Sequence, residues 1–245
     1  MKVFLQREGG EFSNISYLTA WLGFKEFGYE IQFFEWKEID QLPLAQEHIV
    51  TGGIPAVMRC LQRLSIPLPE LSNMPAELTP FAGRKFWWGT LADARQRTTE
   101  TSIEPFFMKP QPSDRKLFNG QVVRCFRDLL PTAGLPAETP IFGSEIVNFE
   151  SEYRVFVLRG EVVGCKHYKG DFRRMIDFQT VDSAIAAFHS APVAYGIDFG
   201  ITDIGRTVLV EVNDSYSFGC YGLGPTRYAA MIESRWNEMV SMKAA

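Results

Sequence analysis

Residues 196–214 read GIDFGITDIGRTVLVEVND, and this stretch decides the fold. Two runs of apolar and β-branched residues, 196–201 and 207–214, have the composition of β-strands. Between them lies Asp203-Ile204-Gly205, a segment with residues typical of tight turns. A strand, a turn and a second strand together predict a β-hairpin.

The register of this hairpin decides which side chains meet. If the turn centres on Ile204 and Gly205, Asp198 lies directly opposite Glu211. Asn213 then shares a face with Glu211, because side chains two residues apart on a strand point to the same side. The opposite face is predicted to carry three core valines: Val208, Val210 and Val212.

Two carboxylates and an amide gathered on one face are suitable ligands for a hard cation. Magnesium prefers a few oxygen ligands from the protein and completes its octahedron with water or phosphate oxygens. The hairpin therefore predicts that Asp198, Glu211 and Asn213 bind Mg²⁺ together with a nucleotide. The alternative is an ordinary half-exposed sheet whose polar face is in contact with water.

Composition excludes several classes of protein. The chain has 245 residues, of which 46% are hydrophobic and 22% charged, as in ordinary globular proteins. A net charge of −4 provides no basic field for a nucleic-acid partner. Apolar runs stay well short of the ~20 residues that span a bilayer, and the N-terminus becomes charged too early for a secretion signal. We therefore expect a cytoplasmic protein without a membrane partner, while its oligomeric state stays open.

The first part of the chain alternates strand and helix patterns. Strands are predicted at 2–6 and 29–36, and helices at 15–27 and 56–64. This alternation favours a small parallel α/β sheet. A proline-rich passage follows, so we predict one domain at 1–80, including this linker, and a second at 81–245. The fold class is predicted as α/β together with α+β.

Two basic residues of the second domain are candidates for phosphate binding. Lys109 ends an apolar strand, where it can extend to water or place a positive charge beside phosphates. Lys116 lies in a polar loop that either closes over a triphosphate or forms an exposed hairpin. Further along, Glu152 and Arg154 share one face of a strand, and a surface ion pair is the alternative explanation for them. Lys166 lies on the next predicted strand.

The order of these pieces resembles the ATP-grasp superfamily. The chain has FMKP at 107–110, SEIVNFESEYRVFV at 144–157, EVNDSY at 211–216 and a late Arg-Trp pair at 235–236. These phrases resemble the R2K clade of that superfamily, and the resemblance covers essentially the whole chain. It implies an ATP-grasp domain preceded by a small pre-ATP-grasp α/β domain.

The resemblance also implies roles for individual residues. ATP would be bound by Lys109, Lys116, Glu145, Ile146, Val147 and Glu152, with residues 145–147 beside the adenine and Glu152 at the ribose. Magnesium would be held by Asp198, Glu211 and Asn213. The cations near the transferring group would be Arg154, Lys166 and Arg173, or Arg174 in place of the last.

The implied activity is an ATP- and Mg²⁺-dependent carboxylate–amine ligase that proceeds through an acyl phosphate. Its partners would be a small-molecule or peptide carboxylate, such as an amino acid, and an amine acceptor. A kinase on the same fold and a non-catalytic nucleotide-binding module are the alternatives. One departure is Gly196, where D-alanine–D-alanine ligase has an arginine, so that either its role would pass to Arg154 or the reaction would differ.

Overall fold

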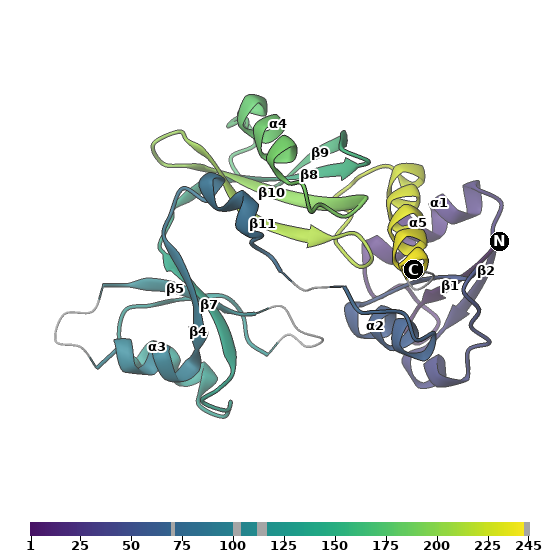
Figure 1. Ribbon diagram of the computed structural model, residues 1–245, viewed down its shortest axis with the longest axis horizontal. Helices are drawn as coiled ribbons and strands as arrows, with labels where there is room; N and C mark the ends of the chain where they lie inside the picture. Colours follow the sequence, from purple (N-terminus) through teal and green to yellow (C-terminus); the bar gives the residue numbers. More distant parts are fainter. Residues whose placement is uncertain (70–71, 100–103, 112–116, 243–245) are drawn as a thin grey trace.

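The computed structural model describes residues 1–69, 72–99, 104–111 and 117–242 (Figure 1). Within these residues the strands form three sheets, with the orders β2-β1-β3, β4-β7-β5-β6 and β11-β10-β8-β9. The lobe containing β4, β5 and β7 and the N-terminal α/β unit lie at opposite ends of the long axis in Figure 1. The described helices include none long and apolar enough to cross a membrane.

The N-terminal unit is a parallel α/β sheet, as its alternating pattern predicts. Both β2 and β3 pair with β1 in parallel. Helix α1 begins after Asn14, whose side chain accepts hydrogen bonds from the backbone N–H groups of Ser16 and Tyr17. The elements of this unit are β1 (Lys2–Gln6), α1 (Ile15–Glu26), β2 (Glu30–Phe34), the 3₁₀ helix η1 (Trp36–Gln41), β3 (Ile49–Thr51) and α2 (Ile54–Arg63).

The second sheet is antiparallel and lies beside a short helix. Its elements are β4 (Phe86–Thr90), α3 (Leu91–Arg97), β5 (Phe106–Pro110), β6 (Gln121–Val123), the 3₁₀ helix η3 (Phe126–Thr132) and β7 (Pro140–Glu145). A separate small core holds it together and includes Leu91, Met108 and Ile141.

The third sheet is also antiparallel, and α4 packs on one of its faces. Val181 and Ala184 of α4 lie in one core with Val155 and Ile197 of the sheet. Polar residues at alternating positions therefore point to the opposite face. The elements are β8 (Phe149–Leu158), β9 (Glu161–Gly170), α4 (Phe178–Ala187), β10 (Ala194–Thr202) and β11 (Thr207–Asp214), with the 3₁₀ helix η2 (Ala76–Phe81) against them.

The hairpin of β10 and β11 has the predicted pairing but a different turn. Asp198 lies opposite Glu211, as predicted. The turn centres on Ile204, because Ile201 pairs with Thr207. Gly205 in this turn adopts a φ of 77°. A β-bulge between Asp198 and its neighbour Phe199 restores the expected pairing. Of the three predicted core valines, only Val212 lies in the core opposite Glu211. Val208 is buried but lies opposite Gly200, on the face of Asp198, and Val210 is half-exposed at the bulge. Leu209 is fully buried in that core instead.

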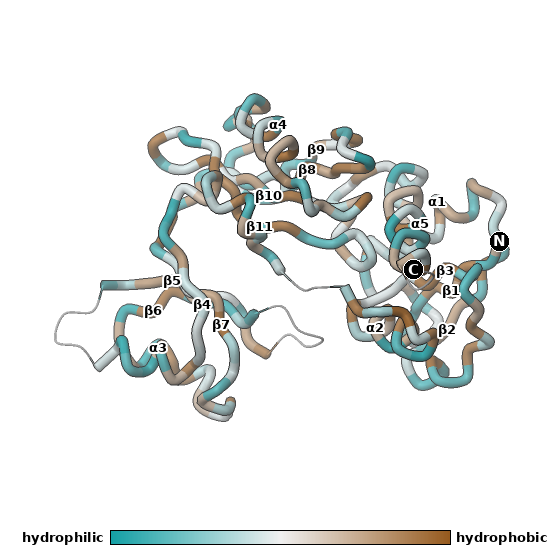
Figure 2. The backbone as a smooth tube through the Cα atoms, in the orientation of Figure 1, coloured by the Kyte–Doolittle hydropathy of each residue, from teal (hydrophilic) through white to brown (hydrophobic). Residues whose placement is uncertain are grey.

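The C-terminal helix α5 (Pro225–Ser241) completes the core of the N-terminal unit. Ile232, Trp236 and Met239 of α5 share a core with Phe4 of β1 and Phe24 of α1. Figure 2 shows apolar segments in β1, the middle strand of the N-terminal sheet, and in β10, an inner strand of the third sheet. The first and last parts of the chain are thus packed together, and a domain boundary at residue 80 stays a prediction.

Helices α1 and α5 approach closely at Gly23. A β-carbon at this position would collide with the carbonyl oxygen of Pro225 and the side chain of Ala229. We expect Gly23→Ala to lower the free energy of unfolding by about 1–2 kcal/mol, because separating the helices outweighs the gain in helix propensity. Thermal denaturation should show a midpoint lower by roughly 2–8 °C.

Gly134→Ala is the matched control, because a β-carbon at Gly134 meets no atom within 4 Å. Its midpoint should stay close to that of the wild type. Equal midpoints for Gly23→Ala and wild type would contradict the close approach of the two helices.

Candidate active site

Four charged residues form one row across the third sheet. Glu211 lies opposite Asp198, Asp198 opposite Arg154, and Arg154 opposite Lys166. Directly opposed residues on neighbouring strands share a face, so the four side chains project from the face away from α4. The sheet therefore gathers two carboxylates and two cations that are distant in sequence.

Arg154 and Asp198 form a buried bidentate ion pair at the centre of this row. The Nε and Nη2 atoms of Arg154 each donate to a different carboxylate oxygen of Asp198, both at 2.7 Å. The two side chains are 4% and 3% exposed. Burial raises the pKa of Asp198 to about 6, against the opposing effect of Arg154. The guanidinium also lies over the ring of Tyr221, 4.7 Å from its centroid.

Glu211 connects the third sheet to the second. Its Oε2 atom accepts a hydrogen bond of 2.6 Å from the Nζ atom of Lys109, which lies on β5. Its Oε1 atom accepts a hydrogen bond of 3.2 Å from the amide of Asn213. Burial alone would raise the pKa of Glu211, but the charge and hydrogen bond of Lys109 outweigh it and lower that pKa. Lys109 and the predicted metal ligands therefore meet in one place.

Glu152 is buried at the next position of the same face, and each of its carboxylate oxygens accepts one hydrogen bond. Tyr168 donates a hydrogen bond of 2.8 Å to one carboxylate oxygen, and Lys169 lies 2.5 Å from the other. The ring of Tyr168 stacks on Tyr221, with centroids 4.8 Å apart. Sequence reasoning missed Lys169, because a bulge on β9 brings it opposite Glu152 and no sequence signal marks that bulge.

The predicted adenine-binding segment connects the second and third sheets. Glu145 ends β7, and β8 begins four residues later at Phe149. The backbone N–H of Lys85 donates to the Glu145 carboxylate at 2.9 Å, and the backbone N–H of Glu145 donates to the carbonyl of Lys85. Ile146 is 45% exposed, and Val147 is half-buried.

One predicted residue, Arg173, is not joined to this group. Arg173 lies in the loop between β9 and α4, is 78% exposed and pairs with Asp171 at 2.9 Å. Its neighbour Arg174 pairs with Glu150. Lys116 lies outside the described residues. The catalytic role of Arg173 and the phosphate contact of Lys116 thus stay predictions.

The donor set fits a magnesium ion bound together with phosphates. The described residues contain no group of three or more His, Cys, Asp or Glu side chains placed to hold a metal ion. Asp198 and Glu211 supply two carboxylates instead, and Asn213 supplies an amide oxygen. Such a partial oxygen set suits Mg²⁺, which retains water or phosphate ligands. A bound ion would share these carboxylates with Arg154 and Lys109.

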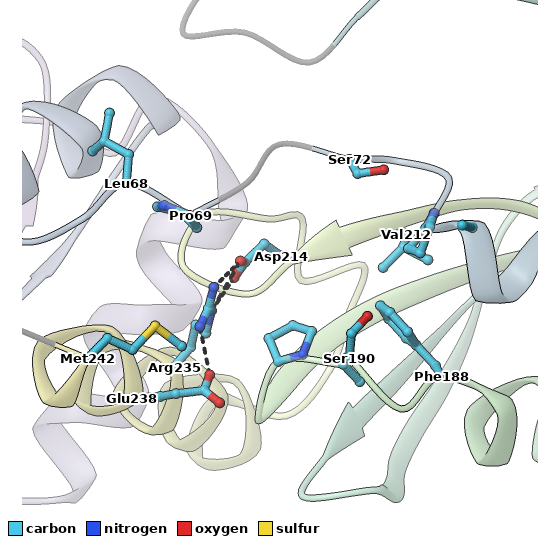
Figure 3. Close-up of a pocket in the computed structure, with 14 residues that line it drawn as sticks. Leu68, Pro69, Ser72, Phe188, Ser190, Val212, Asp214, Arg235, Glu238 and Met242 are labelled. Atoms are coloured by element: carbon cyan, nitrogen blue, oxygen red, sulfur yellow. Dashed lines mark hydrogen bonds and ion pairs between the residues drawn. The ribbon is translucent and has the colours of Figure 1, made fainter. Parts of the chain in front are cut away.

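A cavity of about 530 Å³ lies behind the face of β11 that carries Glu211 (Figure 3). Val212 and Asp214, which alternate with Glu211 and Asn213, line it together with α5 and the linker. Figure 3 shows Arg235 between Asp214 and Glu238. Arg235 is hydrogen-bonded to Asp214 through Nε and Nη2 and to Glu238 through Nη1 at 2.7 Å. This triad anchors the end of β11 on α5.

The sequence matches the family described as ATP-grasp domain, R2K clade family 2, over residues 81–231. This match covers more than half of the chain and includes every residue of the charged row. The chain belongs to that family. A search of curated proteins finds no match.

Solved structures with the same fold are ATP-grasp ligases. D-cycloserine synthetase DcsG superposes with a TM-score of 0.63 at 12% identity, covering 96% of this chain and 100% of that one. D-alanine–D-alanine ligase from Bacillus anthracis has a TM-score of 0.60 at 13% identity, covering 99% and 98%. N5-carboxyaminoimidazole synthetase from Staphylococcus aureus has a TM-score of 0.60 at 11% identity, covering 96% and 77%. The fold is thus similar to that of carboxylate–amine ligases.

Proposed function

We propose that this protein is an ATP- and Mg²⁺-dependent ligase that joins the carboxylate of an amino acid or peptide to an amine. One observation carries the proposal: Lys109 of the second sheet contacts Glu211 of the third at 2.6 Å, so the cation proposed to bind phosphate and the carboxylate proposed to bind metal face each other. The family membership and the fold of known ligases support it. We expect the activity in the cytoplasm, where ATP is supplied.

The nucleotide would lie between the second and third sheets. Residues 145–147 connect these sheets and would border the adenine, mainly through backbone groups. Glu152 would accept hydrogen bonds from the ribose hydroxyl groups, since its carboxylate lies on the same face as Arg154. Lys109 would donate to the phosphates. D-alanine–D-alanine ligase has been solved in complex with ATP on this fold, which supports the assignment.

Magnesium would be held by Asp198, Glu211 and Asn213, and when bound it neutralises the charge that develops on the phosphates. Lys109 and Arg154 already engage the two carboxylates, so the residues are held in position before the ion binds. Glu211 would lie closest to the phosphates because it contacts Lys109 directly. The metal ligands are thus fixed on adjacent, paired strands.

The reaction would proceed in two steps. A carboxylate oxygen of the substrate attacks the γ-phosphorus of ATP, which forms an acyl phosphate and releases ADP. The amine then attacks the acyl carbon, loses a proton and displaces inorganic phosphate. Lys166 is suited to stabilise the acyl phosphate, because its side chain has no ion-pair or hydrogen-bond partner among the described residues.

Arg154 occupies the space that Gly196 leaves open. A β-carbon at position 196 would lie 3.1 Å from Cδ of Arg154 and 3.2 Å from the ring of Phe218. Such contacts are too tight for a larger side chain without movement of its neighbours. The glycine therefore permits the arginine of β8 to reach Asp198, which supports assigning the role of the absent arginine to Arg154.

Calorimetric titration of ATP in the presence of Mg²⁺ tests the nucleotide site. We expect Lys109→Ala to weaken binding roughly 10- to 100-fold, because a charge-assisted contact to phosphate is lost. Lys37→Ala is the control, since Lys37 is exposed and pairs with Glu35 in the N-terminal unit. Tight Mg²⁺-ATP binding that survives Lys109→Ala would contradict the phosphate contact, and no binding to folded wild type would contradict the proposed function.

A further inference from the structure

The bulge in β11 determines the direction in which Glu211 points. Pairs near the turn follow one register, in which Phe199 lies opposite Leu209. Continuing that register would place Val210 opposite Asp198 and Glu211 opposite Ile197, whose side chain is buried in the core under α4. The extra residue of the bulge, Val210, instead brings Glu211 opposite Asp198. A shift of one position turns a side chain to the other face of the sheet. The bulge is therefore a condition for the carboxylate pair.

Arg84 engages the backbone at this bulge. Its Nη1 atom donates to the carbonyl oxygen of Leu209 at 2.7 Å, and its Nη2 atom donates to that of Val210 at 3.1 Å. Nη1 also donates to the carbonyl of Ala82 at 3.0 Å. Since β11 is the edge strand of its sheet, no strand of the described residues lies along its outer side. The guanidinium takes the place of such a strand on the N-terminal side of Glu211.

The outer edge of β11 is held again on the C-terminal side of Glu211. The backbone N–H of Val212 donates to the carbonyl of Asn73 at 2.8 Å, and the amide of Asn73 donates to the carbonyl of Val212 at 3.0 Å. Arg84 and Asn73 thus fix the backbone on both sides of Glu211. The Glu211 side chain stays directed toward Lys109.

The segment that carries Arg84 also leads to the nucleotide side of the site. Gly83 has a φ of 62° and lies against Val208, where a β-carbon would collide with the valine side chain. Lys85 follows and donates its backbone N–H to Glu145. Residues 83–85 therefore contact the metal-binding strand and the connection between the two sheets at once.

We propose that Arg84 is a positioning residue for the metal site: by holding the carbonyls of Leu209 and Val210 it maintains the bulge that directs Glu211 toward Asp198 and Lys109. This inference rests on the proposed function, since it assigns a metal to that carboxylate pair. The guanidinium of Arg84 donates to backbone carbonyls, so its role is to position the strand that carries the ligand. Its effect is on the affinity for the ion, as for other residues that orient metal ligands through the backbone or a hydrogen bond.

The test compares Arg84→Gln with Arg95→Gln. Arg95 is a matched control, because its Nη2 atom also donates to two backbone carbonyls, of Thr132 and Leu135. These contacts join α3 to the end of η3 and the following loop, away from the hairpin. Mn²⁺ alone is titrated into each full-length protein and followed by electron paramagnetic resonance. We expect Arg84→Gln to weaken Mn²⁺ binding roughly 10-fold or more, and Arg95→Gln to leave it unchanged.

A second readout separates positioning from general destabilisation. Hydrogen–deuterium exchange in metal-free protein should increase in the peptide covering β11 of Arg84→Gln, while exchange in β8 stays at the wild-type level. If Arg84→Gln does not fold, Arg84→Lys replaces it, and we expect an intermediate loss of Mn²⁺ affinity because one donor and the charge remain.

The outcomes distinguish the two proposals. Wild-type Mn²⁺ affinity in the folded Arg84 variant would overturn the positioning role and leave the proposed function intact. An equal loss of affinity in Arg84→Gln and Arg95→Gln would also overturn it, since the effect would not be specific to the bulge. Absence of Mn²⁺ binding to the wild type, both alone and with ATP present, would overturn the metal site and, with it, this inference.

Discussion

Glu211→Gln is expected to lower the rate of ADP formation by roughly 10³-fold while leaving the fold intact. The substitution removes the negative charge of the proposed metal ligand that lies closest to the phosphates, and losing one such electrostatic contact in an enclosed site has effects of this size. Glutamine keeps the shape of glutamate and can still accept the hydrogen bond from Lys109. The loss therefore affects the reaction far more than stability.

The rate is measured as coupled ADP release with a carboxylate and amine pair that supports turnover by wild type. Analysis of the product separates a ligase, whose product contains no phosphate, from a kinase. Glu161→Gln, an exposed residue at the start of β9, is the control and should keep the wild-type rate. A rate near the wild-type value in Glu211→Gln would exclude Glu211 as a metal ligand.

The arrangement of the hairpin residues was largely predictable from local pattern. Alternating β-branched residues and turn chemistry were enough to place Asp198 opposite Glu211, and the structure confirms that pair. The prediction assumed a turn centred on Ile204 and Gly205 with regular pairing. The real turn centres on Ile204, which shifts the pairing by one residue, and the bulge at Val210 compensates for this shift. The predicted pair is therefore right, although the strand reaches it differently.

Contacts between elements distant in the sequence could not be predicted from the local sequence pattern. The ion pair of Lys109 and Glu211 joins two sheets, and their relative placement depends on packing that no spacing encodes. The same holds for Arg84, whose partners are backbone carbonyls and therefore carry no side-chain signature. Lys169 reaches Glu152 through a bulge, a feature that periodicity of two cannot anticipate. Sequence thus indicates which residues carry chemistry, and long-range packing determines which of them meet.

Breaking the buried ion pair from the arginine side should give the largest change in stability. Arg154→Met keeps most of the side-chain volume but leaves the Asp198 carboxylate buried without its bidentate partner. Removing one member of such a pair costs about 3–5 kcal/mol, which corresponds to a thermal midpoint lower by roughly 6–20 °C. Thermal denaturation without added metal measures this change.

Magnesium should then stabilise Arg154→Met more than wild type. A cation that binds only the folded protein shifts unfolding by mass action, and in the variant it would also supply the positive charge that Asp198 lacks. The double variant Arg154→Met with Asp198→Asn is the control: it removes both charges, so it should be more stable than the single variant and its midpoint should not respond to Mg²⁺.

If Arg154→Met gained no more from Mg²⁺ than the double variant, Asp198 would not be a ligand of the ion. A double variant no more stable than Arg154→Met would instead show that the lost stability comes from packing around the arginine, and the ion pair would then serve to orient Asp198 without contributing to stability.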